Sequence, residues 1–184
     1  MKTITFITGN IKKLQSAQEV LKRFSIKVLQ EELETPEIQD KDIKKIAEFS
    51  AKFAAEKLDK PVIKVDVGFE INALNGFPGP FSKYINEWLV PDKLLLLLNG
   101  EKNRKAKFID VVAYCEPDKN SISFVAETKG TIAKRMYGNN GWGIDKIFIP
   151  KGYNTTLASL PDKDRSKIWN TSHWYKLACH LSKG

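Results

Sequence analysis

The first thirteen residues constrain the fold more than any other stretch of this 184-residue chain. Thr3–Thr8 is a run of β-branched and aromatic residues, which predicts a strand. The turn Gly9-Asn10 follows at once, and from Ile11 to Phe24 apolar residues recur at helical spacing with lysines on the other side. A strand that passes through Gly-Asn directly into a helix is an architecture that binds phosphate, because the N–H groups and dipole of the helix N-terminus point at the turn.

Strands and helices are mixed along the rest of the chain, and a late hairpin joins two long strands through a polar turn. This pattern predicts an α/β fold with a long central mixed β-sheet and flanking helices, in a single domain over residues 1–184. The expected strands cover 27–30, 62–74, 106–116, 121–128 and 146–150, with 130–133 extending the sheet. The expected helices cover 42–58, 81–98 with a break at Pro91, and 171–181.

The composition indicates an intracellular protein that attracts anions. The chain is 42% hydrophobic, enough for a core, and its net charge of +8 comes from scattered basic residues rather than a basic tail. Cys115 and Cys179 lack metal-ligand spacing and indicate reduced thiols. There is no signal peptide and no apolar run long enough to cross a bilayer, so we expect a cytoplasmic protein without a membrane partner.

The segment "TGNIKK" is the first candidate site. The Thr8 hydroxyl, the Asn10 amide and the Lys13 ammonium could converge on one anion at the start of the helix. The same residues also fit a tight strand-to-helix turn capped by Asn10, and spacing alone does not separate the two interpretations.

Two acidic residues suggest a metal site. Asp66 interrupts the apolar run "VIKVDVGF", where a carboxylate is costly unless it is paired, hydrogen-bonded or bound to metal. Glu37 lies in an irregular acidic loop. Two carboxylates beside a triphosphate suit Mg²⁺, and Mn²⁺ has the same preference for oxygen. The alternatives are a lysine partner for Asp66 and a plain surface role for Glu37.

Three further segments attract attention. "FPGPFSKY" places Ser82 at the start of a helix, as a second phosphate contact or as part of a Pro-Gly turn. Lys52 lies among alanines on the second predicted helix and by itself reads as a solvated lysine. "GWGID" puts Trp142 between two glycines just ahead of Asp145, where an indole has little to pack against.

The motifs "TGNIKK", "PEIQ", "VDVGFEINALNGFPGPFSKY", "GNNGWGIDKIFIPKG" and "SHW" stand in the order found in the inosine triphosphate pyrophosphatase family, which the chain resembles from Thr8 to about Ala178. The resemblance implies two lobes around a nucleotide cleft and hydrolysis of ITP, dITP or XTP to the monophosphate and pyrophosphate. It also implies a homodimer. No arrangement of aromatics and arginines indicates a nucleic-acid partner.

The resemblance also assigns roles. Trp142 would stack on the purine, Asp145 would accept hydrogen bonds from ring N–H groups, and His173 would donate to a 6-oxo group. Asp66 would be the catalytic base and, with Glu37, would hold Mg²⁺. The triphosphate contacts would be Thr8, Asn10, Lys13, Lys52 and Ser82, and further substrate contacts would come from Lys167 and Ser172.

Three positions depart from the family pattern. Val65 stands where the family has a second acid beside Asp66, and Trp174 replaces the arginine of Ser-His-Arg. Lys167 lies one step out of register with a family lysine. Two alternatives therefore stay open: the same chemistry with relaxed base specificity, and a nucleotide-binding homologue with impaired catalysis. Trp169 and Trp174 would either reshape the pocket or pack as ordinary core aromatics.

Overall fold

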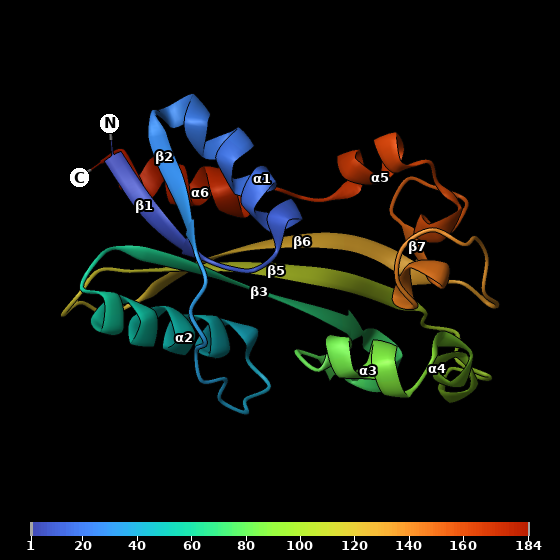
Figure 1. The fold of residues 1–184 in the computed structure, drawn as a ribbon. Helices are drawn as coiled ribbons and strands as arrows, with labels where there is room; N and C mark the ends of the chain where they lie inside the picture. The colour runs from blue at the N-terminus through green and yellow to red at the C-terminus, as the bar shows by residue number, and fades with distance from the viewer. Residues whose placement is uncertain (1, 184) are drawn as a thin grey trace. The chain divides into compact units, whose positions relative to one another are not determined.

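The computed structural model describes residues 2–183, which form a mixed α/β fold around one sheet (Figure 1). Within these residues seven strands join in the order β2-β1-β3-β5-β6-β7, with β4 paired to β3. The strands are β1 (Lys2–Ile7), β2 (Ile26–Glu31), β3 (Val62–Ile71), β4 (Pro78–Gly79), β5 (Lys105–Cys115), β6 (Ile122–Ile132) and β7 (Phe148–Pro150). The α-helices are α1 (Ile11–Leu21), α2 (Ile43–Leu58), α3 (Ser82–Trp88), α4 (Pro91–Leu97), α5 (Asp162–Ile168) and α6 (Ser172–Leu181).

The chain divides into two compact units. Unit 1 comprises Met1–Asp66, Asp110–Ala126 and Thr171–Gly184, and unit 2 comprises Val67–Ile109 and Glu127–Asn170. Each unit has its own apolar core, formed by residues that are distant in the sequence.

In unit 1, β1 pairs in parallel with both β2 and β3, as expected of strands joined through the helices α1 and α2. Figure 1 shows α1 and α6 together on one face of these strands and α2 on the other. The core lies between α1, α6 and the strands, where Phe6 meets Trp174 edge-on at 5.7 Å between ring centroids. The sheet thus holds the N-terminus of α1 at the end of β1.

In unit 2, β4 and β7 run antiparallel to β3 and β6, which makes the sheet mixed. Phe69, Phe108 and Phe148 form the centre of the core, with centroid distances of 4.6 to 5.7 Å. Trp169 packs against Phe108 at 5.1 Å. The core supports the segment 138–145, called here the Trp142 loop, which ends in the short 3₁₀-helix Ile144–Lys146.

Most of the expected elements are confirmed within one or two residues, and Pro91 does separate two helices, α3 and α4. The expected continuation of β3 to residue 74 was wrong, because Asn72–Leu74 forms a 3₁₀ turn that ends in the left-handed residue Asn75. Helix α5 was missed. Trp169 and Trp174 are packing aromatics, as one of the two interpretations had it. Every helix among residues 2–183 is too short or too polar to cross a bilayer.

Candidate functional site

The turn Thr8–Lys13, called here the phosphate turn, is capped as one of the two sequence interpretations predicted. The Asn10 side-chain Oδ1 accepts from the backbone N–H of Lys13 at 3.1 Å, and Thr8 Oγ1 accepts from the N–H of Asn10 at 3.0 Å. These bonds use the acceptor atoms of both side chains. The hydroxyl proton of Thr8 and the Nδ2 donors of Asn10 are the groups that a phosphate needs, so capping and anion binding are compatible.

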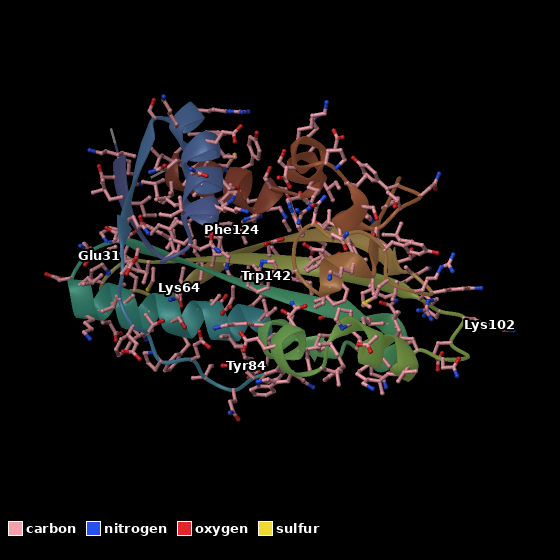
Figure 2. The ribbon with its side chains drawn as sticks, turned by 45° about the vertical axis from the view of Figure 1, so that its right-hand side comes forward. Glu31, Lys64, Tyr84, Lys102, Phe124 and Trp142 are labelled. Carbon is pink, nitrogen blue, oxygen red and sulfur yellow. The ribbon has the colours of Figure 1, made fainter. Side chains whose placement is uncertain are left out.

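A group of charges in unit 1 surrounds Lys13. Burial lowers the pKa of the Lys13 ammonium, and the nearby carboxylates of Asp66 and Asp110 oppose that shift. Lys64, labelled in Figure 2, lies two residues before Asp66 on β3 and therefore on the same face of the strand. Burial also lowers the pKa of Lys64, opposed by Asp66 and Glu37. Asp66 therefore acts on both lysines, and each lysine is also influenced by a second carboxylate, which is Asp110 for Lys13 and Glu37 for Lys64.

Asp66 and Glu37 could hold a divalent cation. Both carboxylates act on the Lys64 ammonium, so they already share one positive neighbour. Mg²⁺ takes one or two protein carboxylates and completes its shell with phosphate oxygens and water, and this donor set fits that pattern. Among residues 2–183 there is no group of three or more His, Cys, Asp or Glu side chains arranged for a metal.

Sequence reasoning missed Asp110 and Lys64. Asp110 interrupts the apolar strand "FIDVVAYC" in the same way that Asp66 interrupts "VIKVDVGF", so the signal was present. Burial raises the pKa of Asp110 to about 6, and the Lys13 ammonium opposes that shift. Val65, where the resemblance led us to expect a second acid, instead packs against the core of unit 1.

Lys52 is not brought into this group. Its ammonium pairs with Glu56, one turn along α2, at 3.9 Å, and its side chain is half exposed. Its charge also acts on Cys115, at the end of β5. Cys115 lies five residues from Asp110 along that strand, about 16 Å away. The half-exposed side chain agrees with a solvated lysine, and the predicted triphosphate contact of Lys52 stays a prediction.

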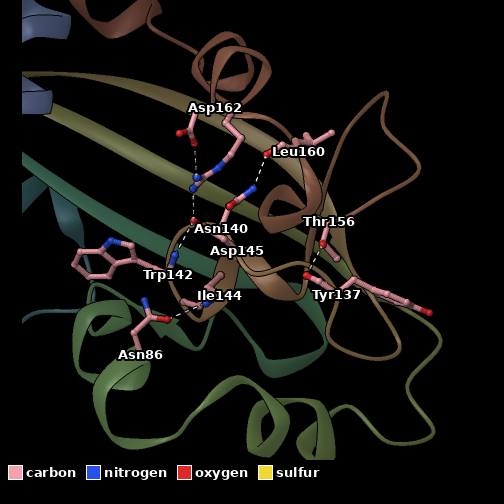
Figure 3. Close-up of polar contacts among 10 residues, drawn as sticks. Asn86, Tyr137, Asn140, Trp142, Ile144, Asp145, Thr156, Leu160 and Asp162 are labelled. Atoms are coloured by element: carbon pink, nitrogen blue, oxygen red, sulfur yellow. Dashed lines mark hydrogen bonds and ion pairs between the residues drawn. The ribbon is translucent and has the colours of Figure 1, made fainter.

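In unit 2 the Trp142 loop carries an exposed indole beside a buried carboxylate (Figure 3). The Trp142 side chain is 63% exposed, and its ring points away from the bonded groups of the loop. The backbone N–H of Trp142 donates to Asp145 Oδ2 at 2.9 Å, and Arg165 on α5 donates to the same oxygen at 2.8 Å. Burial raises the pKa of Asp145, while the Trp142 N–H and the Arg165 guanidinium lower it.

The flanking glycines are required by the loop itself. Gly141 has φ +76°, and a Cβ there would overlap Asp145 and the Arg165 guanidinium. A Cβ on Gly143 would lie 2.9 Å from Oδ1 of Asn86, the atom that accepts from the N–H of Ile144. We expected these glycines to let a base approach the backbone. The structure gives them a second role, which is to let α3 and α5 brace the loop.

The remaining predicted contacts are divided between the units. In unit 2, Ser82 is the first residue of α3, as predicted, and Lys167 on α5 pairs with Asp164 at 3.3 Å with 70% of its side chain exposed. In unit 1, Ser172 begins α6 and His173 is buried. Trp174 is 2% exposed in the core of unit 1, which agrees with the interpretation that it is a packing aromatic.

Two concave regions of about 750 and 760 Å³ lie on unit 2 around β5, β6 and β7. They share Lys105, Thr131 and Ile149 in their linings. None of the predicted nucleotide contacts lines either region, so neither is the candidate site.

Comparison with known proteins connects these residues to one family. The model of the Ham1 family matches residues 4–181. The dITP/XTP pyrophosphatase of Methanopyrus kandleri is 42% identical over 180 residues, covering 94% of this chain and 96% of the relative. The dITP/XTP pyrophosphatase of Methanosarcina acetivorans is 40% identical over 168 residues, covering 91% of this chain and 90% of the relative.

Solved structures give the same result for the fold. The structure of a HAM1 protein from Coxiella burnetii superposes with a TM-score of 0.84 at 28% identity and covers 100% of both chains. The Ham1 protein of Staphylococcus aureus superposes with a TM-score of 0.83 at 27% identity and covers 99% of both chains. The similarity therefore extends over both units.

Proposed function

Because the chain belongs to the Ham1 family, we propose that it is a nucleoside triphosphate pyrophosphatase acting on nonstandard purine nucleotides. Its substrates would be dITP, ITP and XTP, and its products the nucleoside monophosphate and pyrophosphate. The observation that carries the proposal is the 42% identity to a dITP/XTP pyrophosphatase over almost the whole of both chains.

The phosphate turn supports this function because it offers hydrogen-bond donors and positive charge to a ligand. The N-terminus of α1, the hydroxyl of Thr8, the amide of Asn10 and the ammonium of Lys13 would hold the triphosphate. Ser82 at the start of α3 is a further proposed contact. Lys52 is the weakest member of the predicted set, because its ammonium is already paired with Glu56.

Glu37 and Asp66 are the residues that would hold Mg²⁺ or Mn²⁺. When bound, the cation would supply charge neutralisation at the phosphate oxygens and lower the pKa of a coordinated water. Asp66 would accept the proton of the water that attacks the α-phosphorus. The bond from that phosphorus to the bridging oxygen breaks, and pyrophosphate leaves. Lys13 and Lys64, the two ammonium groups on which Asp66 acts, would stabilise the negative charge that develops on the phosphate oxygens during this step.

Base selection belongs to the Trp142 loop. The exposed indole of Trp142 is a surface on which a purine can stack, and Asp145 is an acceptor for ring N–H groups. His173 and Ser172 remain proposed base contacts, and Lys167 a proposed substrate contact. The single nucleotide cleft expected from the sequence stays a prediction.

Product analysis tests the proposal. The chain is incubated with Mg²⁺ and, separately, dITP, ITP, XTP, GTP, ATP and dUTP, and the products are separated by anion exchange. We expect monophosphate and pyrophosphate, at the highest rates for the first three. Diphosphate and free phosphate would contradict the reaction, and equal rates on all six would favour relaxed base specificity.

Two variants complete that experiment. Asp66→Asn should abolish turnover, and Asp118→Asn is the matched control, since Asp118 is exposed in the β5–β6 turn at φ +59°, which asparagine tolerates. Calorimetry with ITP tests the remaining alternative, which is a nucleotide-binding homologue with impaired catalysis. Tight binding by the native chain without pyrophosphate release would identify a homologue that binds nucleotide but does not turn it over.

The sequence also predicts a homodimer in the cytoplasm that does not bind nucleic acid. These stay predictions. The dimer is tested by light scattering of the native chain, and nucleic-acid binding by titration of a labelled oligonucleotide at two salt concentrations.

A further inference from the structure

Arg165 is the residue of α5 that reaches Asp145. Its Nη2 donates to Asp145 Oδ2 at 2.8 Å, and its Nη1 donates to Asp162 at 3.2 Å. The side chains of Arg165 and Asp145 are 19% and 10% exposed, whereas that of Asp162 is 93% exposed. The pair with Asp145 is therefore the one that solvent screens least.

This pairing determines which atom of Asp145 a ligand can use. Oδ2 accepts from both Arg165 and the backbone N–H of Trp142, so both of its bonds come from the protein. Oδ1 is the oxygen left to accept from a ligand. Because the backbone N–H of Trp142 is bonded to the Asp145 carboxylate, the same contacts fix the position of Oδ1 relative to the exposed ring of Trp142.

The pairing also opposes protonation of Asp145. Burial raises the pKa of this carboxyl, and the Arg165 guanidinium is the charged group that opposes the shift, together with the Trp142 N–H. From α3, the neutral amide of Asn86 bonds to Ile144 of the loop. If the guanidinium were removed, the carboxyl would take up a proton more readily and present an O–H donor in place of an acceptor.

We propose that Arg165 is a positioning residue that sets base preference by holding Asp145 as an oriented carboxylate that can only accept hydrogen bonds. A 6-oxopurine carries a proton on ring N1, whereas adenine has an unprotonated N1 that is itself an acceptor. An ionised Asp145 therefore pairs with the first ring and repels the second. This inference rests on the proposed function, because it assumes that a purine meets the Trp142 loop.

The test compares Arg165→Met and Arg165→Lys with the native chain, using kcat and KM for ITP and ATP between pH 6 and 9. Arg165→Met should lower the ITP to ATP ratio of kcat/KM roughly 10- to 100-fold, mainly through the KM for ITP. The defect should be largest at pH 6 and smaller at pH 9, because alkali ionises Asp145 without help. Arg165→Lys restores a charge and should recover part of the ratio.

Two control variants lie on the same helix. Lys163→Met removes an exposed charge, and Asp162→Asn removes the exposed partner of Arg165; both should leave the ratio within twofold of the native value. Circular dichroism of each variant checks the fold. An unchanged ITP to ATP ratio in Arg165→Met, or an equal loss for both nucleotides at every pH, would overturn the inference.

Measurements on the native chain distinguish a failure of this inference from a failure of the proposed function. If it hydrolyses neither nucleotide, the proposed function fails. The Kd values for ITP and ATP, measured by calorimetry in the native chain and Arg165→Met, then give the same ratio without turnover. A ratio near one in the native chain, or unchanged in the variant, overturns the role of Arg165.

Discussion

At the scale of single residues, the main finding is an exposed tryptophan fixed by its own backbone. Trp142 is 63% exposed, yet its backbone N–H donates to the buried carboxylate of Asp145. A large exposed aromatic on a braced loop offers a stacking surface that loses little conformational entropy when a flat ring binds. This arrangement explains why the sequence places a tryptophan between Gly141 and Gly143.

Replacing that indole should weaken binding rather than chemistry. Trp142→Ala should raise the KM for ITP about 5- to 150-fold, since stacking of a base on an aromatic ring is worth about 1–3 kcal/mol, with a smaller change in kcat. Steady-state kinetics measure the effect. Trp88→Ala, at a 75% exposed tryptophan on α3, is the matched control and should leave the KM unchanged. Equal effects of the two substitutions would contradict the role of Trp142.

Asp110 should make stability depend on pH. Its pKa rises from 3.8 to about 6 through burial, so between pH 4 and pH 6 the folded chain binds more protons than the unfolded chain. The free energy of unfolding should therefore fall as pH rises through this range, by at most about 3 kcal/mol, and this contribution should be constant above it. Urea unfolding without Mg²⁺ or nucleotide measures the slope.

Two substitutions test whether Asp110 causes this dependence of stability on pH. Asp110→Asn should remove this part of the slope, while Asp118→Asn in the exposed turn should keep it. A slope that is the same in the native chain and in Asp110→Asn would show that Asp110 ionises at its ordinary pKa.

At the scale of elements, one side chain of the phosphate turn, that of Asn10, has two roles. Asn10 caps α1 through Oδ1, and its amide nitrogen is available for a phosphate. Asn10→Asp should keep the cap and lose the donor, so stability should stay within about 0.5 kcal/mol while the KM for ITP rises at least tenfold. Asn10→Ala should lose both, with about 1 kcal/mol of stability.

Thermal unfolding and steady-state kinetics of the two variants, measured side by side, separate the tasks. If Asn10→Asp binds ITP as well as the native chain does, the turn is a cap and nothing more.

The sequence predicted elements well where local chemistry decides them. The strand-turn-helix at the N-terminus, Pro91 between two helices and the start of α6 follow from β-branched runs, proline and helical spacing. Helix α5 was missed because its seven residues carry no apolar face, and contacts with distant residues, such as the pair between Arg165 and Asp145, hold it in place. Such a pair spans 20 residues of sequence and leaves no periodic signal.

The same distinction between local and distant contacts decides which residues of the candidate site could be predicted from the sequence. Residues within one short motif, such as Thr8, Asn10 and Lys13, could be predicted together because the chain itself holds them close. Asp110 carried the signal of a carboxylate in an apolar strand, but only the fold shows that it lies near Lys13, and only the fold brings Arg165 to Asp145. Lys52 was assigned by resemblance, and its ion pair is the local contact with Glu56 in the same helix.

At the scale of the whole molecule, the net charge of +8 should assist capture of a highly negative triphosphate. Raising KCl from 0.05 to 0.5 M should lower kcat/KM for ITP severalfold, because the screening length shortens to a few ångströms, with less change in kcat. A KM that does not depend on salt would show that only the contacts at the phosphate turn matter.

Strand β1 and helix α6, which lie far apart in the sequence, share one core. Lys2 Nζ donates to the carbonyl of Leu181 at 3.0 Å, and Phe6 packs on Trp174. During synthesis, therefore, the segment that carries the phosphate turn cannot bury its side of this core until α6 has been made, although the residues of unit 2 are made earlier. Until then the apolar side chains of β1 and α1 would be exposed to solvent, which favours aggregation of the partly made chain.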